Sequence, residues 1–183
     1  MRLQFRVVIL ATLTLNLLAC SGMEPLKTVE RVDIDRFMGD WYVIANIPTF
    51  IEKGAHNAIE SYRLDDDGTI DTTFTFRKGG FDGDLKQYNP RGFIVDEQTN
   101  AEWGMQFIWP IKADYRIIYL DDDYRTTVIG RNKRDYVWIM ARTPSIPTSD
   151  YDSIIKHIRK QGYDISKIRP VPQRKGKDEV MQP

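Results

Sequence analysis

The sequence is poor in cysteine and histidine and has no excess of charge of either sign. Cys20 is the only cysteine among 183 residues, so an internal disulfide is excluded. The two histidines, His56 and His157, fall on separate expected elements, which does not favour a metal pair. Lys+Arg and Asp+Glu both number 26, which leaves no net basic character of the kind that binds nucleic acid. We therefore expect no metal site, no cofactor and no nucleic-acid partner.

The chain also lacks an apolar run long enough to span a bilayer. Its N-terminal apolar run, 7–18, is shorter than the ~20 residues that a transmembrane helix needs. Arg2 and Arg6 precede this run, and the first acidic residue is Glu24. A basic start followed by a short apolar stretch is typical of a secretory signal.

The residues that end this stretch, Leu17-Leu18-Ala19-Cys20, resemble the lipobox of bacterial lipoproteins. The resemblance implies that residues 1–19 are a lipoprotein signal peptide and that Cys20 is the lipid anchor. Cys20 would carry a diacylglyceryl group and an N-acyl chain such as palmitate, and two or three acyl chains anchor a protein essentially permanently. Ser21 in place of Asp implies sorting to the outer membrane, on its periplasmic face. The alternative is a chance cysteine at the end of an ordinary cleaved signal.

The rest of the chain is expected to hold one domain. Its length and its apolar content of 42% suit a single core of ordinary size. Residues 20–31 mix small, charged and proline residues without a period, which predicts a lipidated tether that spans about 20 Å. The domain is predicted to cover 32–172, followed by a charged tail over 173–183.

Short runs of β type, separated by turn residues, recur from Trp41 to Thr143 at intervals near ten. Tight turns between consecutive runs predict antiparallel neighbours, and about eight strands close into a small barrel that can hold one ligand. The predicted strands are 41–48, 56–65, 69–77, 86–95, 102–109, 114–121, 124–131 and 135–143.

A helix is expected after Pro147. Ser149 has the chemistry of an N-cap with Asp152 three residues later, and Gly162 is suited to end the helix. Apolar residues at helical spacing predict that one face packs on the outside of the barrel: Tyr151, Ile154, Ile155 and Ile158. A last short strand is expected within Ile165 to Val171.

Three blocks in chain order resemble the lipocalin signature, over about 140 residues. They are Arg36-Phe37-Met38-Gly39-Asp40-Trp41-Tyr42-Val43-Ile44-Ala45, Asp122-Asp123-Tyr124-Arg125 and Asp135-Tyr136-Val137-Trp138-Ile139-Met140-Ala141-Arg142-Thr143-Pro144. The last block is similar to that of the bacterial lipocalin of outer membranes, which is related to apolipoprotein D. The resemblance implies an all-β fold: an eight-stranded antiparallel up-and-down lipocalin barrel with a C-terminal α-helix packed on its outside. It also implies that the barrel, open at one end, binds lysophospholipids, phospholipids or fatty acids.

The signature residues Gly39, Trp41 and Arg142 are expected to close the barrel rather than to bind a ligand. Gly39 allows the backbone to turn into the first strand, while Trp41 plugs the closed end. Arg142 is expected over the indole face, where a cation contributes ~0.5–2 kcal/mol.

Strand alternation, counted from Trp41 and Arg142, predicts which side chains face inward. On the first strand it selects Val43, Ala45 and Ile47. The ligand-binding candidates are Phe74, Phe76, Trp103, Met105, Phe107, Tyr115, Trp138 and Met140. Trp109 shares a face with Phe107, and Tyr115, Tyr119, Arg116 or Arg91 could meet a polar headgroup near the mouth. The alternative is a barrel packed solid by these side chains.

Enzyme signatures are weak, so we expect no catalytic activity. Ser153-Ile154-Ile155-Lys156 fits Ser-x-x-Lys without its companion motifs, and no Gly-x-Ser-x-Gly occurs. The aspartate triplets at 65–67 and 121–123 lack the spacing of an EF-hand and are expected to be solvated turns. No acid–base pair is expected inside the barrel, which makes an enzyme of the calycin type the weakest hypothesis.

Two other hypotheses remain. The first is a lipid-binding barrel tethered to the outer membrane, which stores or transports lipids in membrane maintenance, including envelope stress. The second is a structural or assembly lipoprotein with a packed barrel that binds a protein partner. The sequence leaves open whether the protein is a monomer or a homodimer.

Overall fold

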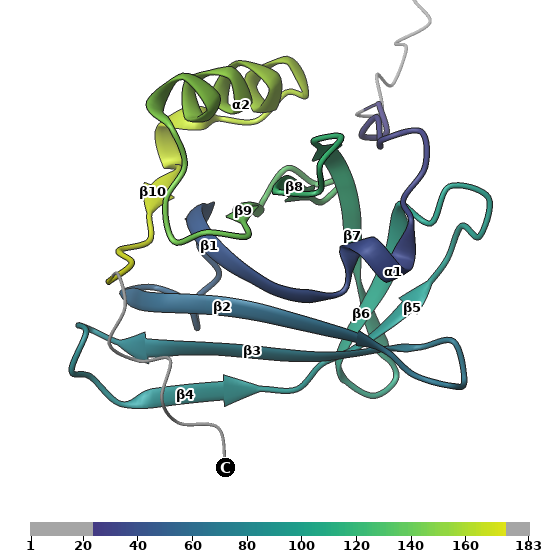
Figure 1. Cartoon of the computed structure of the whole chain (residues 1–183), viewed down its shortest axis with the longest axis horizontal. Helices are drawn as coiled ribbons and strands as arrows, with labels where there is room; N and C mark the ends of the chain where they lie inside the picture. The colour runs from purple at the N-terminus through teal and green to yellow at the C-terminus, as the bar shows by residue number, and fades with distance from the viewer. Residues whose placement is uncertain (1–23, 175–183) are drawn as a thin grey trace, which may run out of the picture.

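The computed structural model describes residues 24–174, and their strands form one antiparallel sheet that closes on itself. From β1 to β9 each strand pairs with the next along the chain, except that β4 and β5 both pair with β3. Pairing of β1 with β9 closes the barrel (Figure 1). The predicted eight-stranded barrel is confirmed. The strands are β1 (Gly39–Ile47), β2 (Ala55–Leu64), β3 (Ile70–Lys78), β4 (Leu85–Tyr88), β5 (Arg91–Ile94), β6 (Glu102–Ile108), β7 (Ile111–Leu120), β8 (Thr126–Gly130) and β9 (Val137–Ala141).

The fourth predicted strand, 86–95, is two strands rather than one. β4 pairs with one half of β3 and β5 with the other, so both occupy one strand position of the barrel. Asn89 and Pro90 separate them. The reason is that Pro90 has no backbone N–H to donate to a strand ladder.

A bulge in β1 corrects the predicted inner face of this strand. Val43 pairs with Met140, but Ala45, two residues on, pairs with Ile139, so β1 contains one extra residue. One extra residue moves all later side chains to the opposite face. Ala45 and Ile47, predicted to face inward, therefore lie in the cluster outside the barrel.

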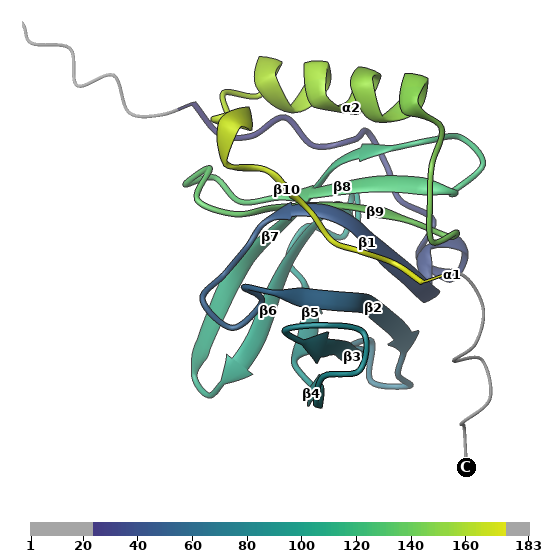
Figure 2. The same ribbon diagram turned by 90° about the vertical axis from the view of Figure 1, so that its left-hand side faces the viewer.

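The helix α2 (Thr148–Lys160) packs across that outer cluster, as predicted (Figure 2). Ile154 and Ile158 are its buried residues. The predicted cap is wrong: Pro147 occupies the N-cap position, and Ser149 lies inside the first turn. The chain leaves the helix through Gly162 at φ +89°, in agreement with the predicted end. After α2 come a short 3₁₀ helix, η1 (Ile165–Lys167), and the two-residue strand β10 (Arg169–Pro170), which pairs with β1.

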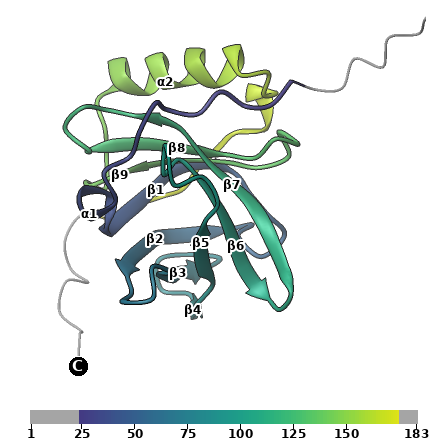
Figure 3. The same cartoon turned by 90° about the vertical axis from the view of Figure 1, so that its right-hand side faces the viewer.

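The described part of the expected tether lies on the barrel. Leu26 is 3% exposed and packs in the cluster beneath α2, and its amide donates to Oδ1 of Asn132 (2.8 Å). The amide of Val29 donates to the carbonyl of Ile117 (3.0 Å). Packing against the barrel thus extends to Leu26, six positions before the predicted domain boundary at 32, because this apolar side chain is buried beneath the helix. Figure 3 shows this segment crossing the barrel between α2 and β7.

The predicted anchor, Cys20, and the signal peptide lie outside the described residues, as does most of the charged tail. Within residues 24–174, no helix has both the length and the apolar content that a membrane span requires. The short helix α1 (Ile34–Phe37), which the sequence analysis did not anticipate, begins at Asp33 and inserts the fully buried ring of Phe37 into one end of the barrel.

Candidate functional site

Trp41 and Arg142, which were expected to close the barrel, lie against each other at one of its ends. The guanidinium carbon of Arg142 lies 3.8 Å from the centroid of the fully buried Trp41 ring. Arg142 also donates to the carbonyls of Met38 (2.8 Å) and Phe37 (3.0 Å). Gly39 has φ +90°, and a Cβ there would lie 3.4 Å from Nη1 of Arg142. These contacts join α1 to the residue that follows β9 across this end of the barrel.

A second aromatic layer forms the floor of the interior. The ring of Phe37 packs edge-on to that of Trp103 (5.5 Å between centroids), and Trp103 stacks on Tyr115 (5.2 Å). The hydroxyl groups of Tyr62 and Tyr115 hydrogen-bond to each other (2.8 Å). Burial is the main cause that raises the pKa of both tyrosines well above its ordinary value. Both hydroxyls are therefore neutral hydrogen-bonding groups at the base of the cavity.

Above this floor is a cavity of about 550 Å³ that opens at the opposite end of the barrel. Its volume is in the range of small-molecule sites, which span roughly 300–1,000 Å³. The predicted ligand residues that border it are Phe74, Met105, Phe107, Tyr115, Trp138 and Met140. The other two, Phe76 and Trp103, are buried in the core but do not border the cavity. The barrel is not packed solid.

Exposed apolar side chains surround the mouth of the cavity. Phe50 and Ile108 border the cavity and are 81% and 72% exposed. Trp109, predicted to face inward, is instead 81% exposed beside Ile111 at the turn between β6 and β7. The reason is that β6 ends at Ile108 and Trp109 lies in the turn that follows, where strand alternation no longer applies. We call Phe50, Ile108, Trp109 and Ile111 the apolar rim.

Two glutamates line the cavity, which the sequence analysis did not anticipate. Glu52, in the connection between β1 and β2, accepts hydrogen bonds from the Thr49 amide (2.7 Å) and from Nε1 of Trp138 (2.8 Å). Glu60 projects from β2, and its Oε2 is buried without a hydrogen-bond partner. Burial raises the pKa of Glu52, while burial and then the charge of Glu52 raise that of Glu60 well above its ordinary value. The expectation that no acid–base pair lies inside the barrel is therefore wrong.

The two carboxyl groups differ in how visible they are in the sequence. Glu60 alternates in phase with Ala58 and Tyr62, both buried, so strand periodicity could have placed it inside. Glu52 lies outside any strand, and no periodic signal marks it. Its side chain reaches the cavity because the connection after β1 folds back toward Trp138.

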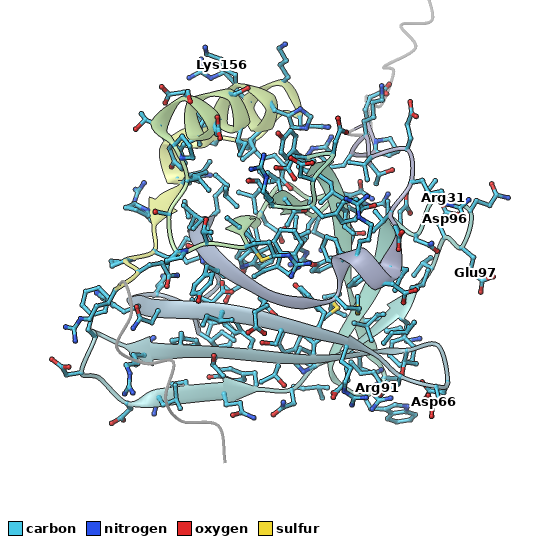
Figure 4. All side chains as sticks on the ribbon, viewed as in Figure 1. Arg31, Asp66, Arg91, Asp96, Glu97 and Lys156 are labelled. Carbon is cyan, nitrogen blue, oxygen red and sulfur yellow. The ribbon has the colours of Figure 1, made fainter. Side chains whose placement is uncertain are left out.

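The other residues that were predicted to contact a headgroup, Arg116, Arg91 and Tyr119, do not border the cavity. Arg116 pairs with Glu102 and Asp114 (2.9 Å to Asp114), so its charge is already matched. Arg91 lies 3.3 Å from Asp65 at the turn between β2 and β3, where Figure 4 shows it beside Asp66. A register shift between Ile117 and Tyr119 places Tyr119 in the outer cluster, beside His157 of α2.

The histidines do not meet. Nε2 of His157 donates to the carbonyl of Ile118 (2.9 Å), and the ring of His56 packs edge-on to Phe81 (5.0 Å). Among the side chains of residues 24–174, no group of three or more is arranged to hold a metal ion.

Comparison with known proteins places the chain among proteins of this architecture. The family model described as a lipocalin-like domain matches residues 32–173. The chain is 31% identical over 160 residues to temperature-induced lipocalin-1 of Arabidopsis thaliana, covering 81% of this chain and 83% of that one. It is 29% identical over 168 residues to outer membrane lipoprotein Blc of Escherichia coli (strain K12), covering 88% and 93%. Insecticyanin from the tobacco hornworm Manduca sexta superposes with a TM-score of 0.67 at 15% identity, covering 84% and 87%.

Proposed function

The chain belongs to the lipocalin family, and from this premise we propose that its barrel binds lysophospholipids, phospholipids or fatty acids at the outer membrane. The bound lipid is stored or transported in membrane maintenance, including under envelope stress. Proteins of this family generally bind small ligands rather than catalyse reactions.

The observation that carries this proposal is the open cavity with apolar walls. Aromatic and methionine side chains from β3, β6 and β9 face it, among them Phe74, Met105 and Met140. The flexible, polarizable side chain of methionine adapts to ligands of variable shape. A packed barrel, which the alternative of a purely structural lipoprotein requires, would leave no such space.

The course of the N-terminal segment supports a mouth that faces the membrane. Near the closed end, the amide of Val32 donates to the carbonyl of Thr99. At the other end of the segment, the amide of Leu26 donates to Asn132, which is next to the cavity-lining Arg131. It therefore reaches the open end of the barrel at Leu26 (Figure 3). Cys20 lies six positions before Leu26, and that length of chain spans at most about 21 Å. A lipid on Cys20 would hold the mouth within this distance of the membrane.

The apolar rim suits the same orientation. Phe50 and Trp109, both 81% exposed, project from different connections around the mouth. Aromatic residues are favoured at the boundary between lipid and water, where part of the ring is apolar and part is wet. A rim that enters the headgroup region would let a lipid pass from membrane to cavity without crossing water.

The proposal is tested with the chain from residue 20 to 183 carrying Cys20→Ala, which contains every described residue. Titration with a lysophospholipid is expected to change the tryptophan emission and to saturate at one lipid per barrel, with Trp138 as the reporter. The Trp138→Phe variant should lose most of this signal, while native mass spectrometry still detects the bound lipid. Failure to bind any lysophospholipid, phospholipid or fatty acid would contradict the proposal.

A further inference from the structure

The position of Glu60 is not explained by the closure of the barrel. Its register partners are Trp41 on β1 and Phe74 on β3, so a carboxyl group lies between two aromatic residues on the inner wall. Buried polar atoms almost always have a hydrogen-bond partner, and leaving one unmade costs free energy. Oε2 of Glu60 has none. A leucine would fill the same place without this cost, so the carboxyl group points to a partner that enters through the cavity.

The charged groups around the cavity leave Glu60 without a counter-ion. Glu52 adds a second acid, and the hydroxyls of Tyr62 and Tyr115 are bonded to each other. Among the described residues, Arg131 is the only cationic side chain that borders the cavity. Its guanidinium lies 3.4 Å from Asp135 and over the ring of Tyr136, and its Nε is buried without a hydrogen-bond partner.

Other charged groups near this wall are engaged as well. Arg142, beyond Trp41, donates to backbone carbonyls at the closed end. Asp114 borders the cavity but pairs with Arg116 and accepts from the Asn132 amide. An anionic headgroup placed beside Glu60 would therefore meet two glutamates, and the one cation that borders the cavity, Arg131, already pairs with Asp135. A cationic group there would meet complementary charge.

Aromatic rings complete the surroundings that an organic cation prefers. The faces of aromatic rings attract ammonium groups, and cages of such rings hold quaternary ammonium ligands. The rings that border the cavity beside Glu60 belong to Tyr62, Phe74, Tyr88, Tyr115 and Trp138. A carboxyl group on a wall of aromatic rings is thus suited to an ammonium group that is attached to an apolar body.

We propose that the cavity selects amphiphiles that carry an ammonium group, which pairs with the carboxylate of Glu60 at depth. This selectivity rests on the proposed function, because it presumes that the barrel takes up an amphiphile. In the empty cavity burial keeps the pKa of Glu60 raised, so binding of the cation ionises the carboxyl group. One proton leaves Glu60 for the solvent, no covalent bond is formed, and the ion pair replaces the O–H bond.

The test compares three probes with the same twelve-carbon chain: dodecylammonium, dodecanol and dodecanoate, each below its micellar concentration. Affinities are measured by tryptophan emission with the Cys20→Ala chain from residue 20 to 183. Dodecylammonium is expected to bind about tenfold or more tightly than dodecanoate, which corresponds to one hydrogen bond between charged groups. Its affinity should rise as pH increases from the ordinary range of a glutamate towards the raised pKa of Glu60, and calorimetry in two buffers should detect proton release.

The Glu60→Gln variant should lose this preference and this pH dependence while binding dodecanol as before. Glu97→Gln, which removes an exposed carboxyl group outside the cavity, is the matched control and should change none of the affinities. The pH series on unchanged Glu60 gives a second reading that does not depend on the variant's folding.

Three outcomes would overturn the inference. Dodecanoate could bind as tightly as dodecylammonium, or Glu60→Gln could leave the preference intact. Dodecanol could bind tightest and weaken as pH rises, which would mean that protonated Glu60 donates to a neutral ligand. If lysophospholipid still binds in these cases, only the selectivity fails, whereas loss of all binding would contradict the proposed function itself.

Discussion

Replacing Arg142 by methionine should lower the free energy of unfolding by about 3 kcal/mol. The cation over Trp41, at 3.8 Å, contributes ~0.5–2 kcal/mol. The hydrogen bonds to the carbonyls of Phe37 and Met38 are partly buried and contribute about 1 kcal/mol each. Those to Arg36 and Asp40 are exposed, so water can replace them and they add little.

Urea unfolding, followed by far-UV circular dichroism, measures this loss. With a slope of about 2 kcal/mol per molar urea, the midpoint should fall by about 1.5 M without a change of slope. Arg142→Lys keeps the positive charge but loses the planar guanidinium group. Its urea midpoint should therefore lie between those of the unchanged protein and of Arg142→Met. Arg125→Met is the matched control: Arg125 and Asp123 are 72% and 70% exposed, and such a pair contributes less than about 1 kcal/mol.

Arg142 does not stabilise the closed end in this way if the free energy of unfolding of Arg142→Met lies within about 0.5 kcal/mol of that of the unchanged protein. A difference of that size is the scatter of ordinary surface substitutions. The stabilising role of the guanidinium is also contradicted if the Arg142→Lys variant is as stable as the unchanged protein, because lysine keeps the charge but lacks the planar group. Arg142 does not border the cavity. Lysophospholipid affinity at 25 °C should therefore be unchanged, and a large change would contradict the separation of the closed end from the ligand site.

Four further predictions concern other parts of the fold. Leu26→Ala should cost about 2–5 kcal/mol in urea unfolding, since Leu26 is 3% exposed under α2, whereas a free tether would show no loss. Gly130→Ala should lower the melting temperature, because its Cβ would lie 2.6 Å from Oη of Tyr163; an unchanged value would refute this. Trp109→Ser should weaken flotation with phospholipid vesicles, whereas Val95→Ser, which removes another apolar side chain that is 67% exposed but lies away from the mouth, should not. Above the ordinary pKa near 4.5, folded Glu60 keeps a proton that the unfolded chain releases. The free energy of unfolding should therefore fall as pH rises from there to the raised pKa, and Glu60→Gln should reduce this slope, as urea midpoints across pH would show.

Much of the architecture could be read from local patterns. Turn residues at regular intervals and alternating β-type runs predicted the barrel, and apolar spacing after Pro147 predicted the helix. The block around Gly39 and Trp41, with Arg142 in the last block, predicted the contact that closes one end. These features are local, or depend on two residues that a family signature ties together.

The site was harder to predict, because it depends on how strands pair. Alternation from Trp41 failed beyond Val43, where a bulge turns Ala45 outward, and at the end of β6, where Trp109 lies in the turn and becomes part of the rim. It also left Glu60 unnoticed, although its phase with Tyr62 was visible, because a carboxyl group was not expected on an apolar wall. Glu52 came into the cavity through a connection that has no periodicity.

The order of residues along the chain was therefore sufficient for the strands, the helix and the residues of the closed end, since each follows from short-range periodicity or a recognisable block. The burial of Leu26, the faces of Ala45 and Trp109, and the meeting of Glu52 with Glu60 depend on the folded barrel. Inter-strand register and side-chain burial are set by partners far away in the chain, and a shift of one residue exchanges the two faces of a strand. The cavity, with Glu52 and Glu60 on its wall, exists only once those distant partners have come together.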